Sequence, residues 1–256
     1  MNRVDVAHTV EFTVEFAGIP ILIHSCSERN SELLRDYLTD KPPLETIDLT
    51  DEDIAKEQKL FDRVAEVYKR PKIKYDRQAL EYQVIHGKVA EKLLKYHVLT
   101  MHGSAICMDG EAYIFIAPSG TGKSTHTRLW REVFGDRCFM INDDKPLIRM
   151  DENHLTVYGT PWAGKHSLSR NVAVPLKAII RLKRGTENRI VAGTPIQAFQ
   201  AFITQGYYPE ENEARKTTLA LEKELAERVH FYELECNMNL DAAYTAWNGM
   251  NVSITQ

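Results

Sequence analysis

The chain has 256 residues, of which 43% are hydrophobic, with a formal net charge of −4 at pH 7 and a pI of about 6.2. This length and apolar share suit one large globular domain, or a domain with a smaller companion. The acidic balance argues against nucleic-acid binding as the main function. No run of about 18 apolar residues occurs, so we expect no transmembrane helix and no membrane partner.

The cysteines favour reduced thiols in a cytoplasmic protein. They stand far apart, at Cys26, Cys107, Cys138 and Cys236, without a Cys-x-x-Cys pair. This spacing indicates neither a disulfide framework nor a zinc site. The segment Met1–Gly18 is interrupted by acidic residues and lacks the apolar core of a signal peptide. We therefore predict a cytoplasmic location.

The N-terminal part is typical of a small α+β segment, which we place at residues 1–75. Alternating residues and turn signals predict strands over Val10–Phe16 and Ile19–His24 and a helix over Ser31–Leu38. Thr50 is a candidate N-cap with Asp53 three residues later. The helix that follows has an apolar stripe of Ile54, Leu60, Val64 and Val67. A further helix is predicted over Arg77–Val98, inside a second domain of residues 76–256.

A β-hairpin leads into the central motif of the chain. The apolar runs Ser104–Met108 and Glu111–Ile116 flank Asp109-Gly110, a strong signal for a two-residue turn. If Met108 faces Glu111, the paired positions sum to 219, and His102 lies opposite Ala117. The register thus predicts His102 at the mouth of the next loop. The alternative is a capping or core histidine at the start of a strand.

The segment Ala117–Thr125, with the sequence APSGTGKST, is typical of a phosphate-binding loop. It lies between a predicted strand and a helix over Thr125–Phe134, so its backbone N–H groups and the helix N-terminus can face anionic oxygens. Lys123 would reach the outer phosphates, and the Ser124 hydroxyl would bind Mg²⁺. Ala117 replaces the first consensus glycine, which is tolerable if its φ is negative. The predicted phosphate-binding residues are Ser119, Gly120, Thr121, Gly122, Lys123, Ser124 and Thr125. The alternative is a chance glycine-rich turn.

Two carboxylates follow the next predicted strand, Cys138–Ile141, in the sequence Asn142-Asp143-Asp144. A Mg²⁺-nucleotide site needs such a group opposite the loop, and one carboxylate with Ser124 and phosphate oxygens would suffice. The second carboxylate could accept a proton from an incoming hydroxyl. The alternative is a surface turn.

The C-terminal half adds basic candidates and further elements. Lys165 and Arg170 are candidates for neutralising charge in the site, whereas the basic residues around Gly185 suggest a solvated hairpin tip or an anion contact. The predicted strands are Leu155–Tyr158, Val172–Pro175, Lys177–Leu182 and Val229–Glu235. The predicted helices run from the Thr194 capping box to Gln205, over Asn212–Glu227 with Asn212 as a plausible N-cap, and over Asp241–Trp247.

With His102-Gly103, the loop and Asp143-Asp144 in this order, the chain resembles the catalytic domain of HPr kinase/phosphorylase, which is related to ATP-dependent phosphoenolpyruvate carboxykinase. The resemblance covers about residues 101–190. It implies an α/β fold of the phosphoenolpyruvate carboxykinase-like P-loop type, with a mixed sheet, flanking helices and a tendency to form homo-oligomers. It also implies bound ATP, Mg²⁺ held by Ser124 and an aspartate, and a second aspartate that deprotonates a serine hydroxyl with help from His102. The sequence does not decide which of the two aspartates binds the metal and which acts as the base. We take Asp143 as the metal ligand and Asp144 as the base.

Two departures bear on the acceptor. Gly159–Lys165 stands where that family has a glycine-rich segment, and residues 1–90 do not resemble its N-terminal domain. Both argue against HPr as the substrate. We expect a kinase that phosphorylates a peptide or small protein, as peptide-tailoring kinases do. The alternatives are a kinase of a small molecule such as free serine, and an ATP-binding regulatory module without turnover.

Overall fold

The computed structural model describes residues 10–251. The first half of the segment 1–18, for which we predicted no signal peptide, lies outside the described residues. The chain divides into two compact units between Leu93 and Leu94. This division falls later than the one expected from the sequence at residues 75 and 76. Within the described part of the chain, no helix is long and apolar enough to cross a membrane.

The first unit combines a three-stranded sheet with helices. Its strands are β1 (Val10–Phe16), β2 (Ile19–Ser25) and β3 (Glu45–Asp48), in the order β1-β2-β3. Its helices are α1 (Glu28–Leu33), a 3₁₀ turn (Arg35–Tyr37), α2 (Asp51–Val67) and α3 (Arg77–Leu93). The predicted α+β segment is thus present. The helix predicted over 31–38 is wrong in its bounds, because α1 begins after Ser27 and tightens into the 3₁₀ turn.

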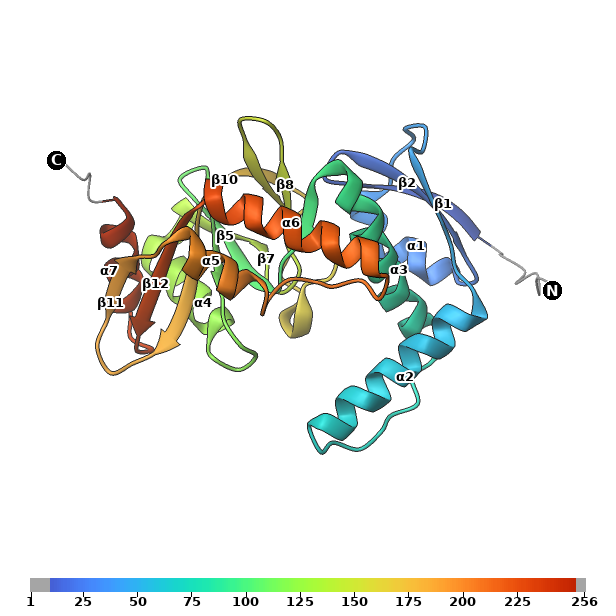
Figure 1. The fold of residues 1–256 in the computed structure, drawn as a ribbon, viewed down its shortest axis with the longest axis horizontal. Coiled ribbons are helices and arrows are strands. Elements are labelled where there is room, and N and C mark those ends of the chain that lie inside the picture. The colour runs from blue at the N-terminus through green and yellow to red at the C-terminus, as the bar shows by residue number, and fades with distance from the viewer. Residues whose placement is uncertain (1–9, 252–256) are drawn as a thin grey trace. The chain divides into compact units, whose positions relative to one another are not determined.

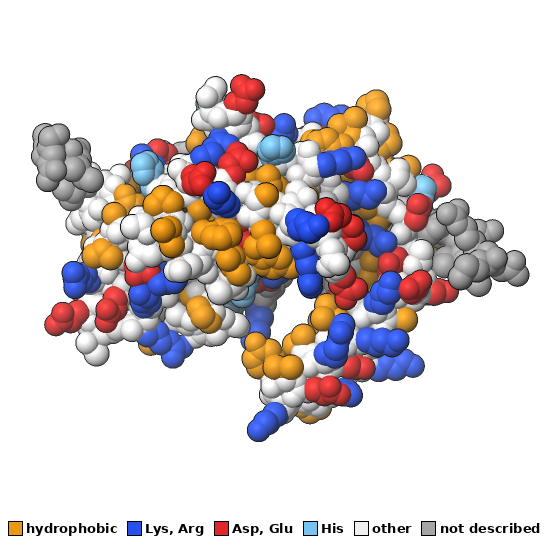
Figure 2. All heavy atoms as spheres, viewed as in Figure 1, with side chains coloured by type: hydrophobic (Ala, Val, Ile, Leu, Met, Phe, Trp, Pro, Cys, Tyr) orange, Lys and Arg blue, Asp and Glu red, His pale blue; other side chains and the backbone are white. Residues whose placement is uncertain are grey.

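Helix α2 begins at the predicted capping box. The Asp53 N–H donates to Thr50 Oγ1 at 3.1 Å, and the Thr50 N–H donates to Asp53 Oδ2 at 3.0 Å. Of the apolar stripe only Ile54 is buried, whereas Leu60, Val64 and Val67 are exposed. Figure 2 shows hydrophobic side chains among the charged ones along α2. An apolar stripe indicates a helix face that can pack against other residues. In α2 most of that face is exposed.

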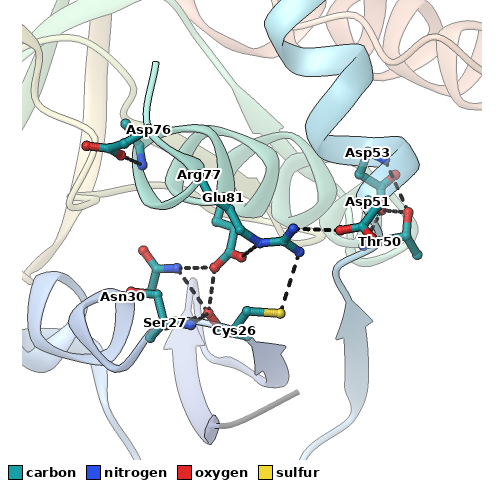
Figure 3. A network of polar contacts seen from close by, with 11 residues as sticks. Cys26, Ser27, Asn30, Thr50, Asp51, Asp53, Asp76, Arg77 and Glu81 are labelled. Carbon is teal, nitrogen blue, oxygen red and sulfur yellow. Dashed lines mark hydrogen bonds and ion pairs between the residues drawn. The ribbon is translucent and has the colours of Figure 1, made fainter. Parts of the chain in front are cut away.

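A polar network ties α3 to the rest of the first unit (Figure 3). Arg77 donates through Nε to Glu81 at 2.9 Å and through Nη1 to Asp51 at 2.6 Å. The fully buried Glu81 carboxylate also accepts from Ser25 Oγ at 2.9 Å and from Asn30 Nδ2 at 2.8 Å. A buried carboxylate needs such partners. This network gives a physical reason why α3 belongs to the first unit, although the sequence placed it in the second domain.

The second unit is built on a mixed sheet of nine strands. Its path is β4-β8-β9-β10-β6-β5-β7, with β12 beside β10 and β11 beside β12. The strands are β4 (Val98–Thr100), β5 (Gly103–Met108), β6 (Glu111–Ile116), β7 (Cys138–Asn142), β8 (Leu147–Met150), β9 (Leu155–Tyr158), β10 (Ala173–Arg184), β11 (Arg189–Ala192) and β12 (His230–Cys236). The helices are α4 (Lys123–Phe134), α5 (Pro195–Phe202), α6 (Asn212–Arg228) and α7 (Asp241–Asn251), with 3₁₀ turns at Leu94–Tyr96, Gly135–Arg137 and Gly164–His166.

Helices cover both faces of this sheet (Figure 1). Ile114 and Ile116 of β6 pack in the cluster that includes residues of α5 and α6. The alternate residues Tyr113 and Phe115 pack in the cluster that includes residues of α4 and α7. Burial on both faces explains why β6 is a continuous apolar run. The predicted α/β class, with a mixed sheet and flanking helices, is confirmed.

Strand β6 lies between an antiparallel and a parallel neighbour. It pairs with β5 in the predicted register, Met108 opposite Glu111 and Gly103 opposite Ile116, and it runs parallel to β10. The turn residues Asp109 and Gly110 have φ of 51° and 84°, as a type I′ turn requires. The hairpin that delivers the loop is therefore confirmed.

Several predicted elements need correction. The two strands predicted over 172–175 and 177–182 are one strand, β10 (Ala173–Arg184), with an irregular register between Leu176 and Ala178. Gly185 is not a hairpin tip, because β12 lies between β10 and β11. The N-cap of α6 is Glu211, not Asn212. Helix α3 ends at Leu93 and α5 at Phe202, whereas α7 extends to Asn251. The short strands β3, β4, β8 and β11 were not predicted.

Candidate active site

The loop between β6 and α4 has the backbone that its glycines allow. Gly120 and Gly122 have φ of 79° and 122°, which disfavour any residue with a side chain. Gly122 is the N-cap of α4, so the helix begins at Lys123. Ala117 is not among the residues with positive φ, and its methyl group therefore causes no strain. Lys123 Nζ donates to the Ala117 carbonyl at 2.8 Å, which folds the lysine back over the loop.

Arg184, at the end of β10, holds the outer side of this loop. Its Nε donates to the Thr121 carbonyl at 3.1 Å, and its Nη2 donates to the Gly120 carbonyl. Carbonyl groups bound by a guanidinium are held away from the anion that the loop N–H groups would bind. The sequence placed Arg184 in a basic cluster but gave it no part in the loop. A pairing of β10 with β6 was needed to bring it there.

Asn142 fixes the turn that carries the two aspartates. Its Oδ1 accepts from the N–H groups of Asp144 at 2.9 Å and Lys145 at 2.6 Å. Its Nδ2 donates to the carbonyl of Thr160 at 2.9 Å and to the Thr160 hydroxyl at 3.0 Å. Because Asn142 is fully buried, these bonds restrict the turn to one geometry.

Asp143 is buried and joined to the loop helix. Its Oδ1 accepts from the Ser104 hydroxyl at 2.6 Å, and that hydroxyl lies 3.1 Å from Thr127 Oγ1 of α4. One oxygen of the carboxylate is thereby fixed on the side of the phosphate loop. Ser104 was missed by the sequence analysis, although it follows His102-Gly103 directly and is the second residue of β5, the strand paired with β6.

Asp144 is more open, with its side chain 31% exposed. His102 Nε2 lies 3.4 Å from Asp144 Oδ1, and Lys145 Nζ lies 4.0 Å from Asp144 Oδ2. Burial, reinforced by the positive charges of Lys145 and Lys123, lowers the pKa of His102 to about 4. The imidazole is therefore neutral at pH 7, and its contact with Asp144 is polar rather than ionic. Lys145 was also missed by the sequence analysis.

The charges of the loop and of the aspartates influence each other. Burial lowers the pKa of Lys123, and Lys145 lowers it further, while Asp144 and Asp143 oppose this shift. Charges couple in this way only at short range. The structure therefore places Lys123, His102 and both aspartates close to one another.

The two other basic candidates have different positions. Lys165 lies in the Gly164–His166 turn, where a Cβ at Gly164 would lie 3.2 Å from the Asp144 Cβ. Its backbone is therefore close to the aspartates, and its side chain is exposed. The Arg170 guanidinium lies 4.6 Å from the Phe139 ring, near the start of β7, and so does not join the carboxylates at the strand's other end.

Comparison with known proteins places the chain in a family. A family model described as "SynChlorMet cassette protein ScmC" matches residues 70–250. The chain belongs to the ScmC family. This match includes the whole site of this ScmC-family chain, from His102 to Arg184. No curated protein matches it.

Among solved structures, the HPr(Ser) kinase/phosphatase from Coxiella burnetii is similar to this ScmC-family chain. The identity is 11%, the TM-score is 0.29, and the alignment covers 49% of this chain and 94% of that one. A likeness this distant carries no argument about the reaction.

Proposed function

We propose that this ScmC-family chain is a Mg²⁺- and ATP-dependent kinase. It transfers the γ-phosphate to the hydroxyl group of a serine in a peptide or small protein. One observation carries the proposal: Lys123 of the phosphate loop, both aspartates and His102 lie in one site, with His102 Nε2 3.4 Å from Asp144 Oδ1. A loop for phosphates beside a partly exposed carboxylate is what phosphoryl transfer to a hydroxyl requires.

The donor set fits Mg²⁺ brought in with a nucleotide. Among residues 10–251, no group of three or more His, Cys, Asp or Glu side chains could hold a metal alone. Ser124 and Asp143 would supply two hard oxygen ligands, with phosphate oxygens and water completing the shell. Bound Mg²⁺ would offset the negative charge of the transferring phosphoryl group.

Asp144 is the group that we assign as base. Its carboxylate is exposed enough to meet an acceptor, and it would take the hydroxyl proton as the acceptor oxygen attacks phosphorus. Neutral His102 beside it can position the acceptor hydroxyl without adding a positive charge that would weaken the base. Lys123, Lys145 and Lys165 would offset charge on the phosphates.

The test is phosphate transfer from γ-labelled ATP with Mg²⁺ to proteins and peptides encoded beside this gene. Asp144→Asn should lower the rate by roughly 10²–10⁴-fold with nucleotide still bound, because it removes the base. Lys123→Ala should weaken phosphate binding as well. Asp136→Asn, at an exposed aspartate outside the site, is the matched control.

The outcomes separate the candidate functions. Transfer that survives in Asp144→Asn would contradict the assigned base. Label appearing on free serine, and competition by serine for the peptide reaction, would identify a small-molecule kinase of the same chemistry. Tight ATP binding without transfer to any acceptor or to water would identify a regulatory module.

A further inference from the structure

A pocket of about 490 Å³ opens beside the phosphate loop of the second unit. Its volume falls within the range of roughly 300–1,000 Å³ that small-molecule sites occupy. One wall is the loop and the first turns of α4, and the other is the end of β10 with the segment after β12. The lining residues are Thr121, Gly122, Thr125, His126, Leu129, Leu182, Lys183, Arg184, Gly185, Cys236, Asn237, Met238 and Asn239.

The pocket lies on the side of the loop away from the aspartates. Its lining includes Thr121 and Thr125 but neither Lys123 nor either aspartate. In a phosphate loop the lysine reaches the outer phosphates, whereas the backbone N–H groups hold the inner ones. The Ser104 hydroxyl joins Asp143 to Thr127 of α4, whereas Thr125 and Leu129 of the same helix line the pocket, so the aspartates and the pocket lie on different faces of α4. The remainder of a nucleotide must then leave the loop on the other side, where this pocket lies.

The floor of the pocket is fixed and largely apolar. Leu129 and Leu182 are buried beneath it. His126 is held by Trp130, whose Nε1 donates to His126 Nε2 at 3.0 Å. Because His126 Nε2 accepts this bond, it carries no proton, and the neutral imidazole forms part of the wall. Such a surface suits a flat, uncharged ring.

Residues 237–239, which follow β12, form the rim of the pocket. Asn237 Oδ1 accepts from the Asn239 N–H at 2.9 Å, and the Asn237 N–H donates to Asn188 Oδ1 at 2.9 Å, which fixes the backbone of the rim. Met238 lines the pocket and is 73% exposed, so its side chain is accessible to a ligand. Methionine is well suited to contact aromatic rings, and a side-chain amide can pair with the donor and acceptor edge of a purine.

We propose that this pocket binds the nucleoside of the nucleotide whose phosphates the loop holds, with a purine base against Met238 and Leu182 and its polar edge at Asn239. The inference rests on the proposed function, since it extends the same nucleotide beyond its phosphates. It assigns the discrimination between nucleoside triphosphates to the rim at residues 237–239. The phosphate loop itself has no part in that discrimination.

Calorimetric titrations of the full chain with Mg-ATP and with Mg-tripolyphosphate test this assignment. Met238→Ser removes the apolar contact, and Asn239→Ala removes the amide, without changing the charge of the protein. Each should raise the Kd of ATP at least fivefold and leave the Kd of tripolyphosphate within twofold. Ile196→Ser is the matched control, because Ile196 is 71% exposed in the same unit and does not line the pocket.

The results distinguish this inference from the proposed function. If both variants change neither Kd, or change both equally, the nucleoside does not bind here, while phosphate binding by the loop stands. If the wild type binds ATP and tripolyphosphate but Lys123→Ala binds neither, the loop is confirmed whatever the variants of the rim show. If the wild type binds neither ligand, both the proposed function and this inference fail.

Discussion

We predict that the second unit loses stability as the pH rises from 4.5 to about 7, because Glu222 has a buried carboxyl group. Glu222 of α6 is fully buried, and burial raises its pKa from 4.5 to about 7, although the hydrogen bond from the Tyr208 hydroxyl opposes the shift. The same carboxyl lies against Gly206, and the neighbouring Gln205 carbonyl accepts from the His102 N–H at 2.7 Å. Glu222 therefore lies close to the backbone segment that is hydrogen-bonded to His102.

The sign follows from proton binding. Because the pKa is higher in the folded state, the folded chain holds more protons than the unfolded chain between pH 4.5 and 7, and stability falls with rising pH across that window. A shift from 4.5 to about 7 corresponds to about 3 kcal/mol at about 1.4 kcal/mol per unit. Glu222→Gln should remove this dependence. The wild type should therefore lose about 3 kcal/mol relative to the variant between pH 4 and pH 8.

Urea unfolding followed by tryptophan fluorescence measures this difference, since Trp130, Trp162 and Trp247 all lie in the second unit. Tyr208→Phe should enlarge the pH dependence, because it removes a bond that lowers the pKa of Glu222. Glu227→Gln, an exposed position on the same helix, should stay within about 0.5 kcal/mol of the wild type. A wild type and a Glu222→Gln variant with parallel stability curves from pH 4 to pH 8 would refute the reasoning.

Two further predictions concern the site. Lys145→Met should raise the pKa of His102 above its value of about 4, because the lysine charge is one cause of the lowered pKa. An NMR titration measures this pKa, and the His102 signal is the imidazole resonance that the His102→Gln variant lacks. An unchanged pKa in Lys145→Met would contradict the prediction. Gly159→Ala should destabilise the second unit by more than about 2 kcal/mol in urea unfolding, because the added Cβ would overlap the Arg170 carbonyl oxygen. Gly193→Ala, whose added Cβ would meet only side-chain atoms, should cost less.

Much of the site was predictable because its determinants are local. A two-residue turn at Asp109-Gly110 sets the register of a hairpin by itself. That register places His102 opposite Ala117, at the start of the loop between β6 and α4. Glycines followed by Gly-Lys-Ser likewise fix a loop geometry from sequence neighbours alone.

The supporting residues were not predictable in this way. Ser104 donates to Asp143, 39 positions away in the chain, and Arg184 donates to Gly120, 64 positions away. Both contacts depend on which strands pair. Lys145 is adjacent to Asp144 in sequence, but only the Asn142 turn directs both into one site. Strand pairing at such separations is decided by the whole core rather than by a local pattern.

The sequence by itself determined the α/β class, the hairpin, the glycine-containing loop between β6 and α4, and the capping boxes, because turns, caps and periodicity depend on residues a few positions apart. Only the tertiary structure decided that β12 inserts between β10 and β11, that α3 belongs to the first unit and that Arg184 binds the loop. These features join segments distant in sequence. Their free energy comes from burial and hydrogen bonds that exist only once the core has formed.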